Sequence, residues 1–473
     1  MYEIKRYLQN RDDVYSIING VESGLKEQLV SGLSGSARSM FTTLIQEATH
    51  KKTLIVTHQL TQAQQLYEDM LEFSQEKNVY LYPVNELLAS ELAVASPELL
   101  SQRITALINW LNTDNAILIA PVAALKRMLP PVEYWQTYQL HFELEQIIDI
   151  DQTLEYLVEM GYLRQDMASS PGEFSLRGGI LDIYPITEEQ PLRIELFDDE
   201  IDSIRYYDAE SQRSLEKQEQ VTIVPTTELL LKDSDLVAAG QKLEQSLNKT
   251  VKKVKNKSDQ QVLTETITAD IDRLNHCERF QEIRKYAAFF YDDNYSLLDY
   301  LPEDGFIILD EMSRIQETAS HLDNEEQEWL KDNLQRGKAV GDSRLSFDWN
   351  EVWNNMKQQR LYLSVFLRHI PNTNPTNIVN LSCRAMQQFH GQMNLLENEM
   401  DRWHKGEISV IILAPNQSRM EKIQSVLEDY QMSATISETL PNLPVQHPVI
   451  TIGNISGGFE LPMHKIAVIT ENE

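Results

Sequence analysis

The sequence predicts an α/β protein in which a parallel-sheet domain carries a smaller inserted α+β domain and is followed by a further α/β domain. Three observations support this class. Short apolar runs alternate with helical patterns over the first 125 residues. Between residues 174 and 207 the pattern changes to closely spaced strands joined by turns rich in Pro, Glu and Asp. An apolar strand that ends in two acidic residues, FIILDE, then follows at residues 306–311.

The alternation predicts where the elements and domains lie. In the first part we expect buried strands at residues 53–57, 79–82 and 116–120, and helices at 59–73 and 98–111. In the last part we expect strands at residues 410–414, 448–452 and 465–470. The domain boundaries follow from these elements and from the break at Pro130 and Pro131. They are 1–125 and 210–345 for the two parts of the parallel-sheet domain, 126–209 for the insertion, and 346–473 for the further domain.

The composition is typical of a globular protein outside membranes. Hydrophobic residues make up 42% of the 473 residues, yet no apolar run approaches the ~20 residues that span a bilayer. The first ten residues lack the apolar centre of a signal peptide. We therefore expect a cytoplasmic protein without membrane contact. Cys277, Cys383 and the ten histidines show no ligand spacing, so no metal site is expected.

The charge of the chain opposes binding to nucleic acid. With 42 basic and 72 acidic residues, the formal net charge is −30, and a polyanion would be repelled from most of the surface. Six lysines between Lys242 and Lys257 run against this trend. They form either a solvated face of a helix or loop, or a DNA contact. The first interpretation is favoured because no aromatic side chains are interleaved.

Residues 32–39, GLSGSARS, resemble a phosphate-binding loop, G-x-x-x-x-G-K-[ST], which has lost two of its functional residues. Gly32 begins the motif, Gly35 lies inside it, and Ser39 remains at the magnesium-side position. Ala37 replaces the second glycine, and its Cβ enters the space of a phosphate. Arg38 replaces the lysine, and a planar guanidinium does not substitute for a compact ammonium. We expect no nucleotide binding here; the alternative interpretation is a Gly/Ser-rich turn that only opens a helix.

Residues 162–215 contain the most specific pattern of the chain. They include YLRQ at 162–165, GEFSLRGGILDIYP at 172–185 and LRIELFDDEIDSIR at 192–205. This pattern resembles the UvrA-binding domain shared by the excision-repair protein UvrB and the bacterial transcription-repair coupling factor, Mfd. An amphipathic sheet would explain the strands but not the ordered charged positions. The resemblance implies a helicase-like fold for the parallel-sheet domain.

Two departures favour the coupling factor over UvrB. UvrB-like proteins keep an intact phosphate loop and a tyrosine-rich hairpin, whereas residues 83–98 contain no aromatic residue. The acidic pair Asp310 and Glu311, a Walker B-like remnant, is followed by Met-Ser where UvrB-like proteins have D-E-S-H. Residues 389–391 and 466–471 also resemble the third domain of the coupling factor. We therefore expect a fragment that corresponds to the amino-terminal portion of a longer protein.

The resemblance implies that arginines of the inserted domain recognise UvrA. The matching positions are Arg164 and Arg177. Ser175 stands where UvrB-like proteins have a further arginine, and Phe174 is either a core residue or an aromatic anchor of the interface. Arginine suits this role because its planar fork can bind a carboxylate bidentately. The alternative for Arg177 is an internal salt bridge with an acid such as Asp182.

These resemblances imply a non-catalytic, UvrB-like scaffold that recruits UvrA to stalled RNA polymerase in transcription-coupled nucleotide excision repair. No catalytic residue and no cofactor are expected in this chain. In longer family members, ATP, magnesium, DNA and RNA polymerase are bound by other domains, and a distant carboxy-terminal domain masks the UvrA surface. The alternatives are an ATP-dependent DNA helicase or translocase, a UvrB-like damage-recognition protein, and a purely architectural clamp.

Overall fold

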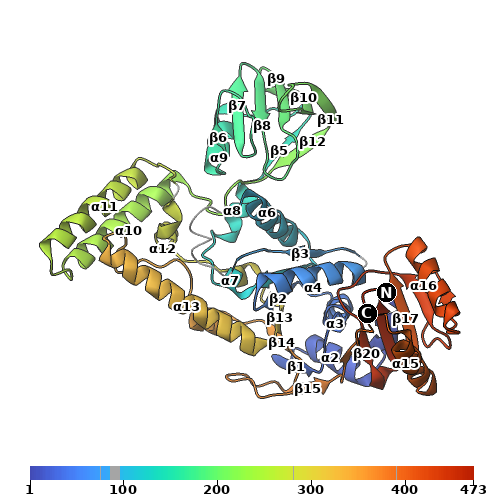
Figure 1. Ribbon diagram of the computed structural model, residues 1–473. Helices are drawn as coiled ribbons and strands as arrows, with labels where there is room; N and C mark the ends of the chain where they lie inside the picture. Colours follow the sequence, from blue (N-terminus) through green and yellow to red (C-terminus); the bar gives the residue numbers. More distant parts are fainter. Residues whose placement is uncertain (75, 86–95, 281, 390) are drawn as a thin grey trace.

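Figure 1 shows the computed structural model of the chain, which describes residues 1–74, 76–85, 96–280, 282–389 and 391–473. The segment compared above with a tyrosine-rich hairpin includes residues 86–95, which lie outside the described residues. Among the helices of the described residues, none has the length and apolar character needed to cross a membrane. The structure confirms the predicted mixture of parallel sheets and α+β units.

The first domain is built on a seven-stranded sheet in which all strands run parallel. Its spatial order is β15 (Asn377–Asn380), β1 (Glu27–Ser31), β14 (Gln359–Ser364), β13 (Phe306–Asp310), β2 (Thr53–Thr57), β4 (Ile117–Pro121) and β3 (Val79–Leu81). Every residue of β2, β4 and β13 is buried, because helices cover both faces of the sheet. The sheet positions β1 and β13 so that the residues after their carboxyl ends form the candidate site.

Helices from distant parts of the chain cover this sheet (Figure 1). Alternate residues of one strand belong to two different hydrophobic clusters: Leu54 and Val56 face one side, and Ile55 faces the other. The helices of this domain are α1 (Tyr2–Gln9), α2 (Asp12–Glu22), α3 (Ala37–Thr49), α4 (Leu60–Phe73), α6 (Pro97–Asn112), α7 (Val122–Leu125), α8 (Val132–Thr137), α13 (Met312–Gln335) and α14 (Trp349–Asn355), with the short 3-10 helix Leu297–Tyr300.

The first sheet extends further along the chain than the sequence predicted. β14 and β15 come from residues assigned above to the segment 346–473, and β14 lies in the middle of the sheet between β1 and β13. The boundary placed at residue 346 therefore cuts through this domain. The strand pattern locates a strand but does not reveal its neighbours, so sequence order alone could not assign β14 to the first sheet.

The inserted domain is antiparallel-rich, as predicted, and projects away from the first sheet in Figure 1. Its six-stranded sheet has the order β11 (Ser214–Gln218), β10 (Glu200–Tyr207), β9 (Leu192–Phe197), β8 (Ile180–Ile183), β7 (Glu173–Arg177) and β6 (Leu163–Arg164). A second pair joins β5 (Leu140–Glu143) to β12 (Gln220–Ile223), and α9 (Ile150–Glu159) accompanies them. Because β11 and β12 follow residue 209, the predicted end of the insertion was too early.

A helical unit separates the insertion from β13, and the sequence did not predict it. The long helices α10 (Asp233–Val251) and α11 (Lys257–Asn275) form a hairpin, which continues into the 3-10 helix Ile283–Tyr286 and α12 (Ala287–Phe290). These elements share a hydrophobic cluster of their own, which includes Leu243, Leu263 and Ile267. Helical periodicity shows that a helix has an apolar face, but it does not show whether that face meets a sheet or another helix.

The last domain has the six-stranded sheet order β16 (Arg384–Ala385), β20 (Phe459–Leu461), β21 (Ile466–Thr470), β17 (Ser409–Ala414), β19 (Val449–Ile452) and β18 (Thr435–Ile436). The strands predicted at 410–414, 448–452 and 465–470 are confirmed as β17, β19 and β21. The helices α15 (Met393–Lys405) and α16 (Gln417–Asp429) pack on it, and a 3-10 turn, Pro462–His464, precedes β21. Leu413 and Val468 share a hydrophobic cluster with Ile55, so this domain is joined to the first one.

Candidate functional site

The loop after β1 has the strand–loop–helix arrangement of a phosphate-binding loop. Gly32 and Gly35 both have positive φ, at 81° and 55°. At Gly32 an added Cβ would lie 2.5 Å from Asn380 Oδ1 and 2.9 Å from Ser382 N, so glycine is required there by both backbone conformation and space. Helix α3 begins at Ala37, which is fully buried. The backbone of the motif is therefore retained, and the change lies in its side chains.

The guanidinium of Arg38 binds both acidic residues that follow β13. Nη1 donates to Asp310 Oδ1 at 2.6 Å, Nη2 donates to Glu311 Oε1 at 2.8 Å, and Nε donates to the carbonyl of Leu33 at 3.1 Å. The side-chain exposures are 12% for Arg38, 1% for Asp310 and 8% for Glu311. One planar fork thus connects the former phosphate loop to the Walker B-like remnant inside the protein.

The remaining acceptors of the acidic pair are also occupied. Gln62 donates to Asp310 Oδ2, the backbone N–H of Val365 donates to Glu311 Oε1 at 2.7 Å, and Arg368 lies 3.3 Å from Glu311 Oε2. Burial raises the pKa of Asp310 to about 6, although Arg38 acts in the opposite direction. Both carboxylates therefore already have partners within the chain.

Residues of the last domain contact the loop at residues 32–39. The N–H of Ser36 donates to the carbonyl of Gly457 at 3.4 Å, and the N–H of Gly457 donates back to Ser36 Oγ at 3.1 Å. Ser456 donates its N–H and its hydroxyl to the carboxylate of Asp69 on α4, at 2.6 and 2.7 Å. A Cβ at Gly35 would lie 3.2 Å from the carbonyl oxygen of Gly458. The segment 456–458 therefore contacts the face of the loop.

The residues present do not fit a magnesium nucleotide. Such a ligand needs free loop N–H groups and a carboxylate and a hydroxyl near the metal. Here the Ser36 N–H is directed at Gly457, and Asp310 is bound to Arg38. The hydroxyl of Ser39 is buried, 3.5 Å from Asp69 Oδ2. A small polar cavity of about 200 Å³ remains between Arg38, Asp69 and Ser456.

The inserted domain places the four predicted contact residues in different environments. Arg164 is exposed and has no hydrogen bond or ion pair with the part of the chain that the structure describes. Arg177 has a side-chain exposure of 45% and donates Nη2 to Asp182 Oδ2 at 2.8 Å, so the internal salt bridge considered above is present. Arg164 is in register with Phe174, and Arg177 lies three residues further along β7. The pairing of β6 with β7 therefore does not place Arg164 beside Arg177.

Phe174 and Ser175, the other two candidate contact residues, are buried, so the structure favours the interpretation of Phe174 as a core residue and does not present either side chain to a partner. Their relative exposures are 0% and 1%. Phe174 lies opposite Ile183 in the apolar core, and Ser175 lies opposite the buried Asp182. Gly178 and Gly179 directly follow β7. They form the two-residue turn between β7 and β8, in which Gly178 has a φ of 63°.

Further charged residues share the sheet face of Arg177, and the sequence analysis did not select them. Asp182 is in register with Arg193, which in turn is in register with Arg205. Arg193 binds Asp182 bidentately, at 2.7 and 2.9 Å. Arg205 binds Glu195, and its hydrogen bond lowers the pKa of this carboxyl. The alternation of Arg193 and Glu195 with apolar neighbours along β9 was the signal that could have identified this face.

Comparisons with known proteins find two matching families, each over one part of the chain. The profile of the UvrB interaction domain family matches residues 140–229, and that of the MFD D3 domain matches residues 404–473. The transcription-repair-coupling factor of Bacillus subtilis (strain 168) is 45% identical over 473 residues, which are 100% of this chain and 40% of the relative. That of Staphylococcus haemolyticus is 34% identical over 99% of the chain and 39% of the relative. The chain is a homologue of the amino-terminal, UvrB-like region of the transcription-repair-coupling factors.

The chain spans about 40% of the length of these coupling factors. Within this region, the exposed arginines lie in the UvrB interaction domain, because residues 140–229 include β6 to β10. The segment 456–458 that contacts the phosphate-loop remnant lies in the D3 domain. In this coupling-factor homologue, the loop at residues 32–39 is therefore part of a contact between two domains.

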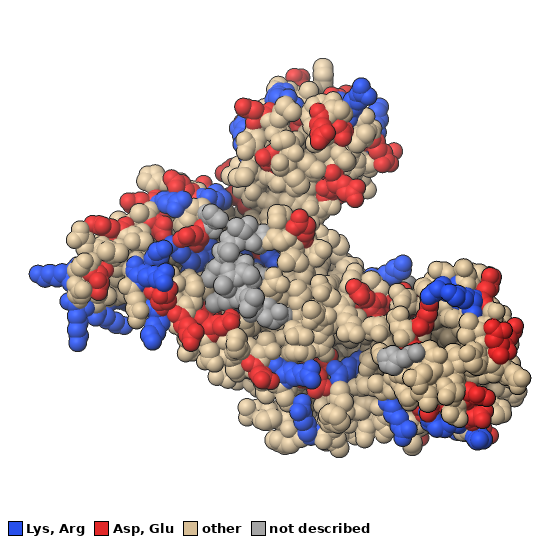
Figure 2. All heavy atoms as spheres, in the orientation of Figure 1, with Lys and Arg blue, Asp and Glu red and all other residues tan. Residues whose placement is uncertain are grey.

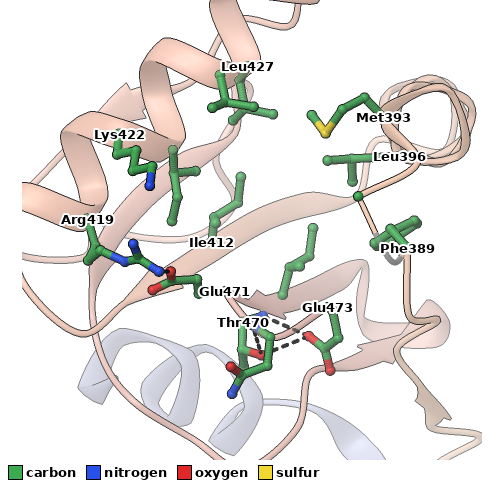
Figure 3. Close-up of a pocket in the computed structure, with 15 residues that line it drawn as sticks. Phe389, Met393, Leu396, Ile412, Arg419, Lys422, Leu427, Thr470, Glu471 and Glu473 are labelled. Carbon is green, nitrogen blue, oxygen red and sulfur yellow. Dashed lines mark hydrogen bonds and ion pairs between the residues drawn. The ribbon is translucent and has the colours of Figure 1, made fainter.

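The last domain, which includes the matched D3 residues, also contains an apolar cavity of about 380 Å³ (Figure 3). Met393 and Leu396 of α15 line one side, Leu427 of α16 lines another, and Ile412 of β17 lies at the base. Arg419 and Glu471 form an ion pair at its edge. None of the predicted site residues is among the described residues that line this cavity, and nothing in the lining points to a particular ligand.

Proposed function

We propose that this chain is a non-catalytic recruitment module that presents its UvrB interaction domain to UvrA in transcription-coupled repair. The observation that carries the proposal is the position of Arg38, whose guanidinium binds both Asp310 and Glu311 in the former nucleotide site. A motor lobe whose acidic pair is held in this way supplies no magnesium site. The first domain instead supplies a rigid body from which the UvrB interaction domain projects.

The shape of the inserted domain supports the binding half of the proposal. The domain extends away from the first sheet, and its surface carries mixed Lys, Arg, Asp and Glu side chains in Figure 2. Arg164 and Arg177 are accessible for carboxylates of a partner. Arg177 makes a single hydrogen bond to Asp182, while Arg193 already holds that carboxylate with two. A partner's carboxylate can therefore bind Arg177 without leaving Asp182 uncompensated.

The remaining partners of this proposal are assigned to regions of the relatives that this chain does not match. By resemblance to the coupling-factor family, RNA polymerase, DNA, ATP and magnesium are bound by domains beyond the matched region, and a carboxy-terminal domain masks the UvrA surface. A cytoplasmic location belongs to the same proposal. An assay with these 473 residues alone should detect binding of UvrA without prior activation.

Titration of purified UvrA against the chain tests the binding half. The double variant Arg164→Ala, Arg177→Ala should lose about 2–5 kcal/mol of binding free energy, which abolishes a micromolar contact. The matched control is Arg213→Ala, because Arg213 is exposed in the same domain. It should bind UvrA as the wild type does. Equal affinity of the double variant and the wild type would refute the assignment of these arginines.

An ATPase assay with and without DNA tests the non-catalytic half. No turnover above background is expected from the wild type. The variant Ala37→Gly, Arg38→Lys, which restores the loop consensus, should also remain inactive, because residues 456–458 still contact the loop. Turnover by the wild type that is lost in Glu311→Gln would establish an enzymatic function instead.

A further inference from the structure

The hairpin of α10 and α11 ends in a group of lysines, which we call the lysine tip: Lys252, Lys253, Lys255 and Lys257. All four side chains are exposed. In Figure 1 the hairpin extends away from the other domains, and Figure 2 shows Lys and Arg side chains gathered at its free end. The tip is therefore accessible to a large partner without rearrangement of the fold.

The backbone that carries the lysine tip is well ordered by its own contacts. Gln260 donates its side-chain amide to the carbonyls of Val254 and Val251, at 2.6 and 3.2 Å, and so closes the turn between the helices. Asn256 caps α11 by accepting the N–H of Ser258 at 3.0 Å. The four ammonium groups therefore start from a fixed turn, which reduces the entropy lost when they bind together.

The hairpin is also anchored to the rest of the molecule next to the tip. Ser246 Oγ donates to Asp342 Oδ2 at 2.8 Å, and the N–H of Gly341 donates to Thr250 Oγ1 at 2.8 Å. A Cβ at Gly337 would lie 3.0 Å from Leu263 N, so the end of α13 packs closely on α11. The hairpin is thus held in place next to the tip by residues that follow α13.

The charges of the lysine tip are not compensated within the described residues. Lys242 and Lys249, nearer the base of the hairpin, lie 3.2 and 3.9 Å from Asp292 and Asp342. In the described part of the chain, by contrast, no carboxylate lies within 4.0 Å of any lysine of the tip. Asp259 is the one acidic residue between positions 251 and 260. The tip is therefore a positive pole on a chain with a net charge of −30.

We propose that the lysine tip binds the phosphate backbone of double-stranded DNA. Ammonium groups act as point charges on phosphates and do not distinguish bases. Residues 242–257 contain no aromatic side chain for stacking on unpaired bases, and for this reason the sequence alone favoured a solvated face. The position of the exposed lysines at the free end of the hairpin changes this preference, because a contact with the phosphates of a duplex needs no stacking. The acidic surface elsewhere repels DNA, so the contact is confined to the tip and has a defined orientation. This contact is separate from the proposed binding of UvrA and does not depend on it.

The test is fluorescence anisotropy of a labelled 30-base-pair duplex (a length of about three helical turns) with the full chain, from low to moderate salt. The tip variant replaces Lys252, Lys253, Lys255 and Lys257 by Gln. The control variant replaces four exposed lysines on other units by Gln, which changes the net charge equally: Lys217, Lys331, Lys357 and Lys405. A third variant replaces the tip lysines by Arg. Circular dichroism and thermal melting establish that all variants are folded.

We expect the tip variant to bind the duplex at least about tenfold more weakly at low salt. The slope of log K against log salt should fall by about 3–4, since each phosphate contact contributes about 0.9. The control and the Arg variant should bind within about twofold of the wild type. Equal losses in the tip and control variants would overturn the proposal, as would undetectable wild-type binding. Competition by polyglutamate as effective as that by duplex DNA would also overturn it, in favour of an acidic protein partner.

Discussion

Arg38 and Arg177 are both paired with aspartates, but the two regions use the same side chain for opposite purposes. Arg38 lies within the first domain, is 12% exposed, and is the bidentate partner of two buried acids. Arg177 lies at the surface of the inserted domain, is 45% exposed, and makes one hydrogen bond to an acid that Arg193 already neutralises. An arginine that is the main partner of a buried carboxylate is occupied by it. An arginine remains available to another protein when a second arginine already neutralises the same carboxylate.

The largest expected effect follows from the dependence of the acidic pair on Arg38. Arg38→Ala should lower the free energy of unfolding by about 3–5 kcal/mol, because it leaves Asp310 and Glu311 buried without their shared cation. Chemical denaturation measures this loss. The control is the same substitution in an Asp310→Asn, Glu311→Gln background, where the loss should fall to about 1 kcal/mol. Equal losses in both backgrounds would contradict the role of the ion pair.

An intermediate effect should separate the two arginines that contact Asp182. Arg193→Ala removes the bidentate partner of a carboxylate that is 1% exposed, and should lower the free energy of unfolding by about 3 kcal/mol. Arg177→Ala removes one partly exposed hydrogen bond and should lower it by less than about 1 kcal/mol. Thermal and chemical unfolding of the two variants test this order. The reverse order would show that Arg177 is a structural residue rather than an available one.

The smallest expected effect concerns pH. The pKa of Asp310 is raised to about 6 by burial, so the folded chain takes up this proton before the unfolded chain does. The contribution of Asp310 to stability should therefore increase as the pH falls from 7.5 to 5, by about 1 kcal/mol. The free energies of unfolding of the wild type and Asp310→Asn, compared across this range, give the measurement. A difference between them that does not change with pH would contradict the raised pKa.

The sequence predicted each half of the Arg38 site but not their contact. The degenerate loop and the acidic pair were both recognisable as local motifs, whereas the ion pair joins residues 272 positions apart. The contact with residues 456–458 could not be predicted either, because backbone donors of a loop have no residue signature. In the same way, the run of lysines predicted a charged segment, but its position at the end of a hairpin depends on helix packing.

Burial in the inserted domain shows another limit of sequence patterns. Alternation along β7 and β9 correctly separates an apolar face from a charged one. It fails at Ser175, which lies on the charged face but is buried. Long side chains cover short ones on the same face of a sheet, and here Arg177 and Arg193 both bind Asp182, which lies opposite Ser175. A one-strand pattern contains no information about such coverage.

The place of β14 in the middle of the first sheet has a consequence during protein synthesis. β1 ends at Ser31, but its neighbour β14 begins only at Gln359, with the inserted domain and the helical unit made in between. At about 5–20 residues per second, a ribosome needs tens of seconds to cover this interval. During that time the apolar edge of β1 lacks this neighbour, while all strands of the insertion have already left the ribosome. The projecting domain can therefore be complete before the body that carries it.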